Sequence, residues 1–231
     1  LTILPIILSP FLSKNTKIIL RISGLPKLTF LRKVIWKMFS KYIYKITAPT
    51  KTTFKLLKNS NLFDNKKIFL LRDPVIDHEE ILKYKNLQIS KKFEKKKYIL
   101  SIGRLTGQKN FSFLIKMFSK YKKYINVDYL LIIGEGEEKR KLKKIIKKLK
   151  CENSVHLLGF KKNVYNYINK CEFLISTAAY EDPGFALIEA AFLKKKIITS
   201  LVKNGPLEMK QNGNFCYFFS FNNEKSFLNT I

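Results

Sequence analysis

The pattern of apolar and polar residues predicts a regular α/β architecture from residue 98 onwards. Four short apolar runs read as strands: KYILSIG, VDYLLIIG, SVHLLG and EFLIST. Between them, FSFLIKMFSKYKKY, EEKRKLKKIIKKLK and VYNYINKC place apolar residues at helical spacing, and the second carries the i, i+3, i+4, i+7 stripe of an amphipathic helix. Because strands and helices alternate, we expect a parallel sheet with helices on both faces, as in doubly wound domains.

The part before residue 78 is less regular. Apolar residues follow helical spacing over 29–46, with lysines and an arginine on the opposite face. ITAPTKTTFKLLK predicts a strand, a turn and a helix capped by Thr50 or Thr52, and KIFLLRDPVID predicts a strand with an extended exit at Pro74. The basic helix could pack on a sheet or lie on a membrane interface, and the pattern leaves both open. The apolar positions of this helix are Leu31, Val34, Ile35, Met38, Phe39, Tyr42 and Ile46.

A charged stretch with little apolar periodicity, Asp77 to Lys97, marks the boundary between these parts. We expect a partial first domain over residues 1–85, a linker over 86–97 and a second domain over 98–231. Because the chain starts with Leu1 and its last segment has no closing element, we expect it to be part of a longer protein.

Composition adds a core and a large positive charge. Hydrophobic residues make up 46% of the chain, and 45 Lys and Arg against 17 Asp and Glu give a net charge of +28. Such charge suits phosphate-bearing partners. The lysines are spread along the whole chain without a nucleic-acid-binding signature, so a general compositional bias explains the charge better than nucleic-acid binding does. An anionic membrane surface or a phosphorylated substrate fits the charge at least as well as nucleic acid. Three dispersed cysteines indicate neither a disulfide framework nor a metal site, and a reducing compartment is the default expectation.

The most informative stretch for chemistry is 175–200, which reads as strand, loop, helix and strand. The sequence Asp182-Pro183-Gly184 begins the helix, so N–H groups of residues 185–187 would present the positive helix end to a phosphate. Glu181 precedes this point, and Glu189 lies inside an otherwise apolar helix, where an unused carboxylate would be costly. A helix cap and a solvated helix residue are the alternatives for these two.

A second loop supplies cations. Gly103 and Arg104 follow a predicted strand, and Lys109 comes five residues after the arginine. An arginine and a lysine from one strand-end loop suit a diphosphate, although both could be ordinary surface residues. Gly134-Glu135-Gly136 after the next strand matches a dinucleotide fingerprint only weakly, and a turn with positive φ explains it better. Ligands of open parallel sheets bind at the carboxyl ends of strands, so these loops should share one site.

Together these segments resemble the retaining GT-B glycosyltransferases of group 1, which form family four of the sequence classification. The similarity covers residues 98–219, and 18–77 resemble the latter half of the family's N-terminal, acceptor-side domain, whose first strands we expect to precede Leu1. The fold implied is α/β, with two Rossmann-like domains and an incomplete N-terminal one. The segments that carry the resemblance are ILSIGRLTGQKN, LLIIGEGEEKRKL, VHLLGF, EDPGFALIE and NGPLEMKQNG.

The resemblance implies transfer of a sugar from a nucleotide sugar to a glycan or lipid-linked acceptor with retention, without metal or cofactor. Arg104, Lys109 and Glu181 would be catalytic. The two cations would bind the diphosphate, Glu181 would hold the sugar hydroxyls and Glu189 the ribose hydroxyls. The nucleotide-sugar-binding set would be Gly103, Arg104, Lys109, Gly134, Phe160, Gly184, Phe185 and Glu189.

We therefore expect a cytoplasmic enzyme of surface polysaccharide or lipopolysaccharide synthesis, with docking on the inner face of the plasma membrane as an added expectation. The alternative is a basic module that binds nucleic acid or membranes without catalysis. Two departures from the family stand out. Asp182-Pro183-Gly184 replaces the usual Gly-Phe-Gly, and three lysines, 194–196, stand where a Gly and a Pro are usual.

Overall fold

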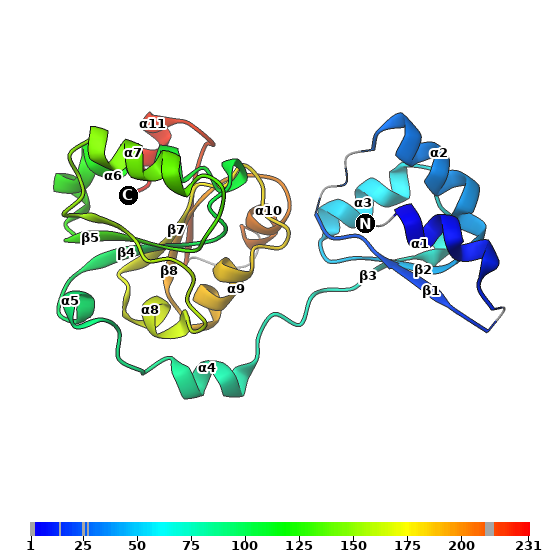
Figure 1. Cartoon of the computed structure of the whole chain (residues 1–231), viewed down its shortest axis with the longest axis horizontal. Coiled ribbons are helices and arrows are strands. Elements are labelled where there is room, and N and C mark those ends of the chain that lie inside the picture. Colours follow the sequence, from blue (N-terminus) through cyan, green and yellow to red (C-terminus); the bar gives the residue numbers. More distant parts are fainter. Residues whose placement is uncertain (1–2, 14, 25, 27, 211–214) are drawn as a thin grey trace.

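The computed structural model describes residues 3–13, 15–24, 26, 28–210 and 215–231. The chain forms two α/β bodies, one before and one after an extended connection at residues 71–77 (Figure 1). The N-terminus lies in the first body and the C-terminus in the second. None of the described helices combines the length and the apolar content that crossing a bilayer requires.

The first body is built on a three-stranded parallel sheet in the order β1-β2-β3. Its core contains Trp36, whose ring lies 5.4 Å from that of Phe63. The side chain of Thr50 caps helix α3 by accepting a hydrogen bond from the N–H of Thr53, which confirms one of the two predicted caps. The elements are α1 (Ile3–Leu8), η1 (Ser9–Phe11), β1 (Ile18–Arg21), α2 (Phe30–Phe39), η2 (Ser40–Tyr42), β2 (Ile43–Ala48), α3 (Lys51–Asn59), η3 (Asn65–Lys67) and β3 (Ile68–Leu70).

The helix predicted over residues 29–46 is too long. Helix α2 ends at Phe39, and the chain then enters strand β2 at Ile43. The buried residue of α2 is Trp36, while Leu31 and Met38 of the predicted apolar face are 65% and 63% exposed. The prediction failed because apolar residues occur on more than one side of α2. In addition, the isoleucines of β2, a residue type that sheets favour, continue the helical spacing by chance.

The second body contains a six-stranded sheet in the order β6-β5-β4-β7-β8-β9, with every neighbouring pair parallel. This arrangement confirms the expected doubly wound sheet. Its elements are β4 (Tyr98–Ile102), η4 (Gly107–Lys109), α6 (Phe111–Ile125), β5 (Tyr129–Ile133), α7 (Lys139–Lys148), β6 (Val155–Leu157), α8 (Tyr165–Lys170), β7 (Phe173–Ser176), α9 (Phe185–Phe192), β8 (Lys196–Ser200), α10 (Gly205–Met209), β9 (Cys216–Phe219) and α11 (Glu224–Leu228).

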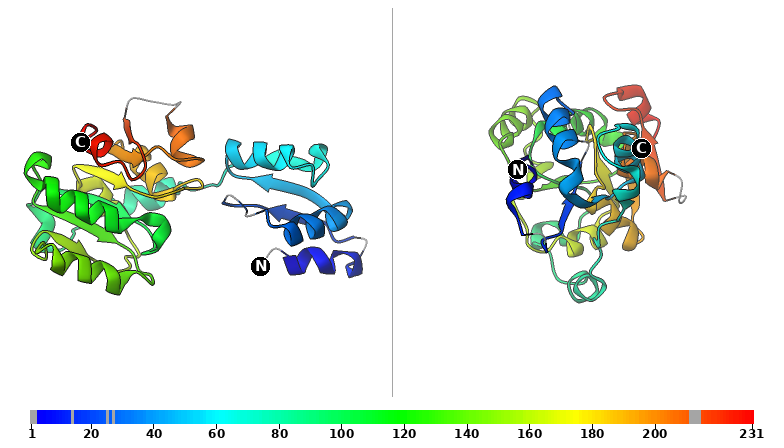
Figure 2. Two further views of the ribbon diagram at one scale, coloured as in Figure 1. Left: turned by 90° about the horizontal axis from the view of Figure 1, so that it is seen from above. Right: turned by 90° about the vertical axis from the view of Figure 1, so that its right-hand side faces the viewer.

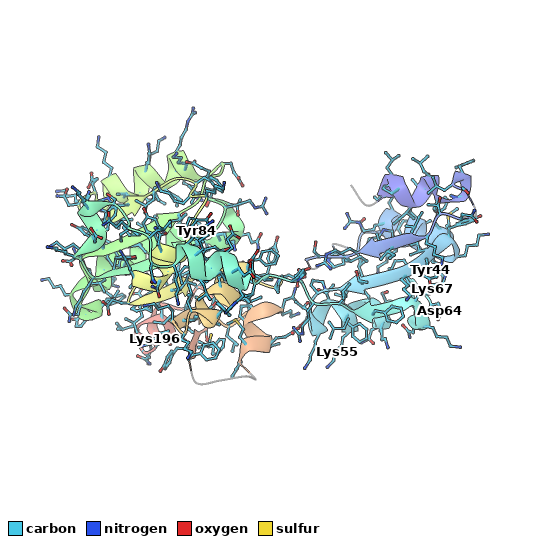
Figure 3. The ribbon with its side chains drawn as sticks, turned by 90° about the horizontal axis from the view of Figure 1, so that it is seen from below. Tyr44, Lys55, Asp64, Lys67, Tyr84 and Lys196 are labelled. Atoms are coloured by element: carbon cyan, nitrogen blue, oxygen red, sulfur yellow. The ribbon has the colours of Figure 1, made fainter. Side chains whose placement is uncertain are left out.

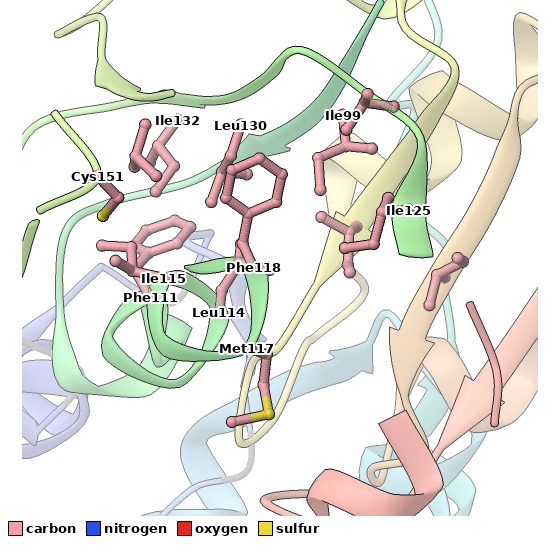
Figure 4. Close-up of a cluster of buried hydrophobic side chains, with 14 of the residues drawn as sticks. Ile99, Phe111, Leu114, Ile115, Met117, Phe118, Ile125, Leu130, Ile132 and Cys151 are labelled. Carbon is pink, nitrogen blue, oxygen red and sulfur yellow. The ribbon is translucent and has the colours of Figure 1, made fainter. Parts of the chain in front are cut away.

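Helices cover both faces of the second sheet (Figures 1 and 2). Residues of α6, α7 and α11 form one buried cluster with the strands, and residues of α8 and α9 form another on the opposite face. Figure 4 shows Phe118 and Leu114 of α6 packed beside Leu130 and Ile99 of the sheet. The apolar stripes that predicted the helices are therefore the faces by which these helices pack on the sheet.

The segment expected to be a linker, 86–97, is part of the second body. Helix α4 (His78–Tyr84) precedes this segment, and helix α5 (Lys91–Glu94) lies within it. Asn163 donates a side-chain hydrogen bond to the carbonyl of Tyr84, and the ring of Phe93 lies 5.3 Å from that of His156. A few buried apolar residues anchor this segment without giving it a regular period, so the sequence pattern did not reveal the packing.

Candidate active site

A cavity of about 690 Å³ lies where the carboxyl ends of β4 and β7 face the first body. Loops of the second body supply most of its wall, and the turn after β1 supplies the rest. Seven predicted site residues, Arg104 among them, share this cavity. Its lining residues are Ser23, Gly24, Ile102, Gly103, Arg104, Gln108, Lys109, Val164, Tyr180, Glu181, Asp182, Gly184, Phe185, Ala186 and Glu189.

Lys109 reaches the cavity because the loop after β4 is held in a defined shape. The lysine side chain passes directly over Gly103, where an added Cβ would lie 2.7 Å from its Cε. Asn110 takes the left-handed conformation with φ 54°, which turns the chain into α6. The buried hydroxyl of Thr177 lies 3.1 Å from the carbonyl oxygens of both Lys109 and Asn110. This loop is therefore tied to the end of β7.

Lys109 and Glu181 form an ion pair inside the cavity. Lys109 Nζ lies 2.6 Å from Glu181 Oε1, and only 8% of the glutamate side chain is exposed. The lysine supplies the opposite charge that a buried carboxylate needs. Two of the three predicted catalytic side chains are thus within reach of one ligand.

The N-terminal end of α9 opens onto the same cavity. Gly184 precedes the helix with φ 91°, a conformation that glycine adopts readily. Phe185 and Ala186 line the cavity, but the N–H of Leu187 donates to the carbonyl of Gly184 at 3.0 Å. The expectation that the Leu187 N–H faces the ligand is therefore wrong, because the first turn of α9 uses that group internally.

Glu189 lies farther along α9 and is largely buried. Burial raises the pKa of its carboxyl, and the negative charge of Glu80 on α4 raises it further. Burial also raises the pKa of the Tyr165 hydroxyl, with Glu189 as the next cause. This part of the cavity thus combines a carboxylate, a phenol and a neighbouring acidic helix.

Two residues of the predicted nucleotide-binding set do not line the cavity. Gly134 has φ 144°, and a Cβ there would lie 1.9 Å from the carbonyl oxygen of Gly103. The turn with positive φ that the sequence suggested is present at this residue. Gly134 therefore lets two strand-end loops approach each other. Phe160 lies after β6, and 75% of its surface is exposed.

The structure adds cavity residues that the sequence reasoning missed. Ser23 and Gly24 come from the first body, in the turn after β1. Gln108 lies between the two predicted cations and donates its side-chain amide to the carbonyl of Tyr180. The dipeptide Ser-Gly after an apolar strand was a visible signal for a turn. The sequence did not show that this turn faces loops of the second body.

The described residues contain no group of three or more His, Cys, Asp and Glu side chains arranged to hold a metal ion. All three cysteines are buried free thiols. Burial raises the pKa of Cys171 and Cys216 to about 12, which leaves both in the unreactive thiol form at neutral pH.

Comparison with known proteins gives consistent matches. Residues 83–231 match the family described as "Glycosyl transferases group 1". An uncharacterized glycosyltransferase of Methanocaldococcus jannaschii is 32% identical over 218 residues, which is 86% of this chain and 51% of that protein. The N-acetylgalactosamine-N,N'-diacetylbacillosaminyl-diphospho-undecaprenol 4-alpha-N-acetylgalactosaminyltransferase of Campylobacter jejuni is 36% identical over 132 residues, 57% of this chain and 35% of that protein. The chain thus spans about half, or less, of the length of these relatives.

Solved structures agree on the fold. TarM of Staphylococcus aureus in complex with UDP, Fondaparinux and alpha-GlcNAc-glycerol superposes with a TM-score of 0.75 at 22% identity, covering 94% of this chain and 43% of TarM. Anabaena HepE in complex with UDP gives a TM-score of 0.75 at 13% identity, covering 99% of this chain and 64% of HepE. The fold is of the GT-B type.

Proposed function

Because this chain belongs to the family of group 1 glycosyl transferases, we propose that it transfers a sugar from a nucleoside diphosphate sugar to a glycan or lipid-linked acceptor. The names of its relatives support this proposal. The Campylobacter jejuni relative is named for a diphospho-undecaprenol acceptor, and S. aureus TarM and Anabaena HepE were solved with UDP.

The cavity that both bodies line carries the proposal. Arg104 and Lys109 are the cations for the donor diphosphate, and the N-terminal end of α9 adds its positive dipole. Glu181 accepts hydrogen bonds from the sugar hydroxyls and Glu189 accepts them from the ribose. Gly103, Gly184 and Phe185 complete the wall around the donor.

This arrangement suits the chemistry of glycosyl transfer. The bond between the anomeric carbon and the diphosphate oxygen breaks, a bond from the acceptor hydroxyl oxygen to that carbon forms, and the hydroxyl proton passes to the departing diphosphate. Negative charge grows on the leaving diphosphate, where Arg104 and Lys109 stabilise it more strongly in the transition state than in the bound donor. The proposal includes retention at the anomeric carbon and no requirement for a metal or cofactor.

We also place the enzyme in surface polysaccharide or lipopolysaccharide assembly, in the cytoplasm and at an anionic membrane surface. Helix α2 supports the membrane part. Phe30 and Leu31 are 85% and 65% exposed, Met38 is 63% exposed, and Lys33 and Lys37 are exposed on the same helix. Exposed apolar residues flanked by lysines complement an anionic bilayer, whose interior takes the apolar groups and whose headgroups attract the lysines.

Donor binding tests the enzymatic proposal. Replacing Arg104 and Lys109 by alanine in the full-length protein should lower affinity for UDP, GDP or ADP sugars by at least about 100-fold, because two charge-assisted contacts are lost. Lys116→Ala, an exposed lysine on α6, is the matched control. Calorimetry measures the affinity. Unchanged binding in the double variant would contradict the proposal.

A sugar-transfer assay tests the stereochemistry and the metal requirement. The anomeric configuration of the product, determined by NMR, should be that of the donor. Addition of EDTA should leave the transfer rate unchanged.

A further inference from the structure

Two carboxylates of the second body contact the N-terminal end of helix α3 in the first. Asp182 Oδ2 accepts a hydrogen bond of 3.1 Å from the hydroxyl of Thr53. Glu208 Oε1 accepts one of 2.5 Å from the N–H of Lys51, the first residue of α3. Arg72, at the end of the first body, pairs with the other Glu208 oxygen at 2.9 Å. These contacts join the two bodies beside the donor cavity.

The contacts are partly buried and lie at the N-terminal end of a helix. Thr50 and Thr53 are 1% and 0% exposed, and the Glu208 side chain is 13% exposed. The N-terminal end of a helix carries partial positive charge, so it stabilises negative side chains placed there. Burial raises the pKa of the Asp182 carboxyl, the negative charge of Glu208 raises it further, and the hydrogen bond from Thr53 acts in the opposite direction. The contact with α3 therefore offsets part of the cost of burying Asp182.

The two carboxylates are parts of one packed unit in the second body. The N–H of Gly205 donates to the carbonyl of Glu181 at 3.1 Å, and Asn204 forms an isolated parallel bridge with Glu181. A Cβ at Gly205 would lie 1.6 Å from the carbonyl oxygen of Pro183. Helix α10, which carries Glu208, thus lies against the loop that carries Asp182. Asp182 and Glu208 are therefore both connected to Glu181 through this packed loop and helix.

We infer that Asp182 and Glu208 form an interdomain clamp on α3 that holds the two bodies closed around the donor and positions Glu181. The inference rests on the proposed function and gives a role to Asp182, which stands where the family usually has glycine. Asp182 is a positioning residue in this assignment.

The distance between the bodies reports on the clamp without substrate. Spin labels on Lys55→Cys in α3 and Lys162→Cys after β6 would sit on exposed positions of the two bodies, and Figure 3 shows Lys55 on the first. The three native cysteines are buried, so the engineered thiols react selectively. Asp182→Ala and Thr53→Val in the full-length protein should each broaden the distance distribution. Thr52→Val, on the same turn of α3, should not.

Kinetics separate positioning from mere folding. Asp182→Ala should lower kcat about tenfold or more while changing nucleotide affinity less than about threefold, because Arg104, Lys109 and Glu189 all belong to the second body. Asp182→Asn keeps an acceptor for the Thr53 hydroxyl and should recover most of the rate. In a double-mutant cycle, Thr53→Val should add little to Asp182→Ala, since both remove the same contact.

Distances and kcat that stay at wild-type values in both Asp182→Ala and Thr53→Val would overturn the clamp. An equal effect of Thr52→Val would also overturn it. If the distances broaden but the wild-type protein transfers no sugar, the clamp stands and the proposed function fails. If Asp182→Ala does not fold, Thr53→Val decides, because valine keeps the shape of the threonine side chain.

Discussion

The two glutamates of the cavity differ in how their charge is balanced. Glu181 pairs with Lys109 at 2.6 Å, whereas Glu189 is buried near Glu80, and both burial and this negative neighbour raise its pKa. A carboxyl whose pKa is higher in the folded than in the unfolded chain binds protons more tightly when folded. Its contribution to stability is therefore most favourable at low pH and declines as the pH rises through the folded pKa. Glu189 thus lowers the stability of the free protein at neutral pH.

Glu189→Gln should accordingly raise the melting temperature of the free protein and weaken nucleotide binding. The gain in stability is on the order of 1 kcal/mol, or about 2–4 °C in a chain of this size, since the buried charge is removed. Affinity for UDP, GDP or ADP should fall at least about tenfold because an ionised acceptor for the ribose is lost. Thermal unfolding and calorimetry measure the two effects. A lower melting temperature would contradict this reading.

The pH dependence supplies the control. Nucleotide affinity should fall as the pH drops through the raised pKa of Glu189. Glu80→Gln removes one cause of that shift, so it should move the loss of affinity to lower pH. Glu79→Gln, on the same exposed helix, should leave the profile in place.

At the scale of secondary structure, the backbones that follow β4 and β5 are in direct contact at Gly103 and Gly134. The N–H of Gly103 donates to the carbonyl of Ile133, and the N–H of Gly134 donates to that of Gly159. A Cβ at Gly134 would meet backbone atoms of Gly103, which cannot swing aside as a flexible side chain can. The glycine is therefore required for the pairing of these strand ends.

Gly134→Ala should destabilise the protein by on the order of 3 kcal/mol, because the strand ends must separate and φ is positive there. Gly107→Ala is the matched control, since the nearest atom to its added Cβ is Glu138 Oε1 at 4.0 Å. Urea denaturation measures both. Equal stabilities of the two variants would show that the strand ends can adjust.

The elements of the second body were predictable because its strands are buried on both faces and its helices carry one apolar stripe each. The end and the buried face of helix α2 were not, because Trp36 packs on one side while Phe30 and Met38 remain exposed on the other. When a helix carries apolar residues on two faces, its sequence does not show which face is buried. After the end of α9, Lys194 adopts the αL conformation with φ 56°, at the position where a glycine is usual.

For the whole molecule, the sequence predicted two bodies and seven of the residues that share the cavity, but it could not predict which groups of the first body face them. Ser23, Gly24 and Thr53 reach the second body only through tertiary packing between distant segments. The charge of +28 was compatible with several partners. Family membership favours an enzyme over a non-catalytic basic module.

Membrane association is the prediction that belongs to this scale. Phe30→Ser with Leu31→Ser in the full-length protein should reduce binding to vesicles of phosphatidylglycerol and phosphatidylcholine about tenfold or more, since two large apolar side chains no longer enter the bilayer. Tyr124→Ser on α6, with 76% of the tyrosine exposed, is the control. Sedimentation with vesicles gives the partition. Binding that persists in the double variant would place the contact elsewhere.

The clamp also has an evolutionary consequence. Thr53 and Asp182 lie 129 positions apart, yet one hydrogen bond makes each useful only in the presence of the other. A lineage that returned position 182 to glycine would release selection on the hydroxyl at position 53, and the reverse also holds. The two bodies of this protein are therefore expected to have changed together at these sites, so that exchanging one body between relatives would separate a matched pair.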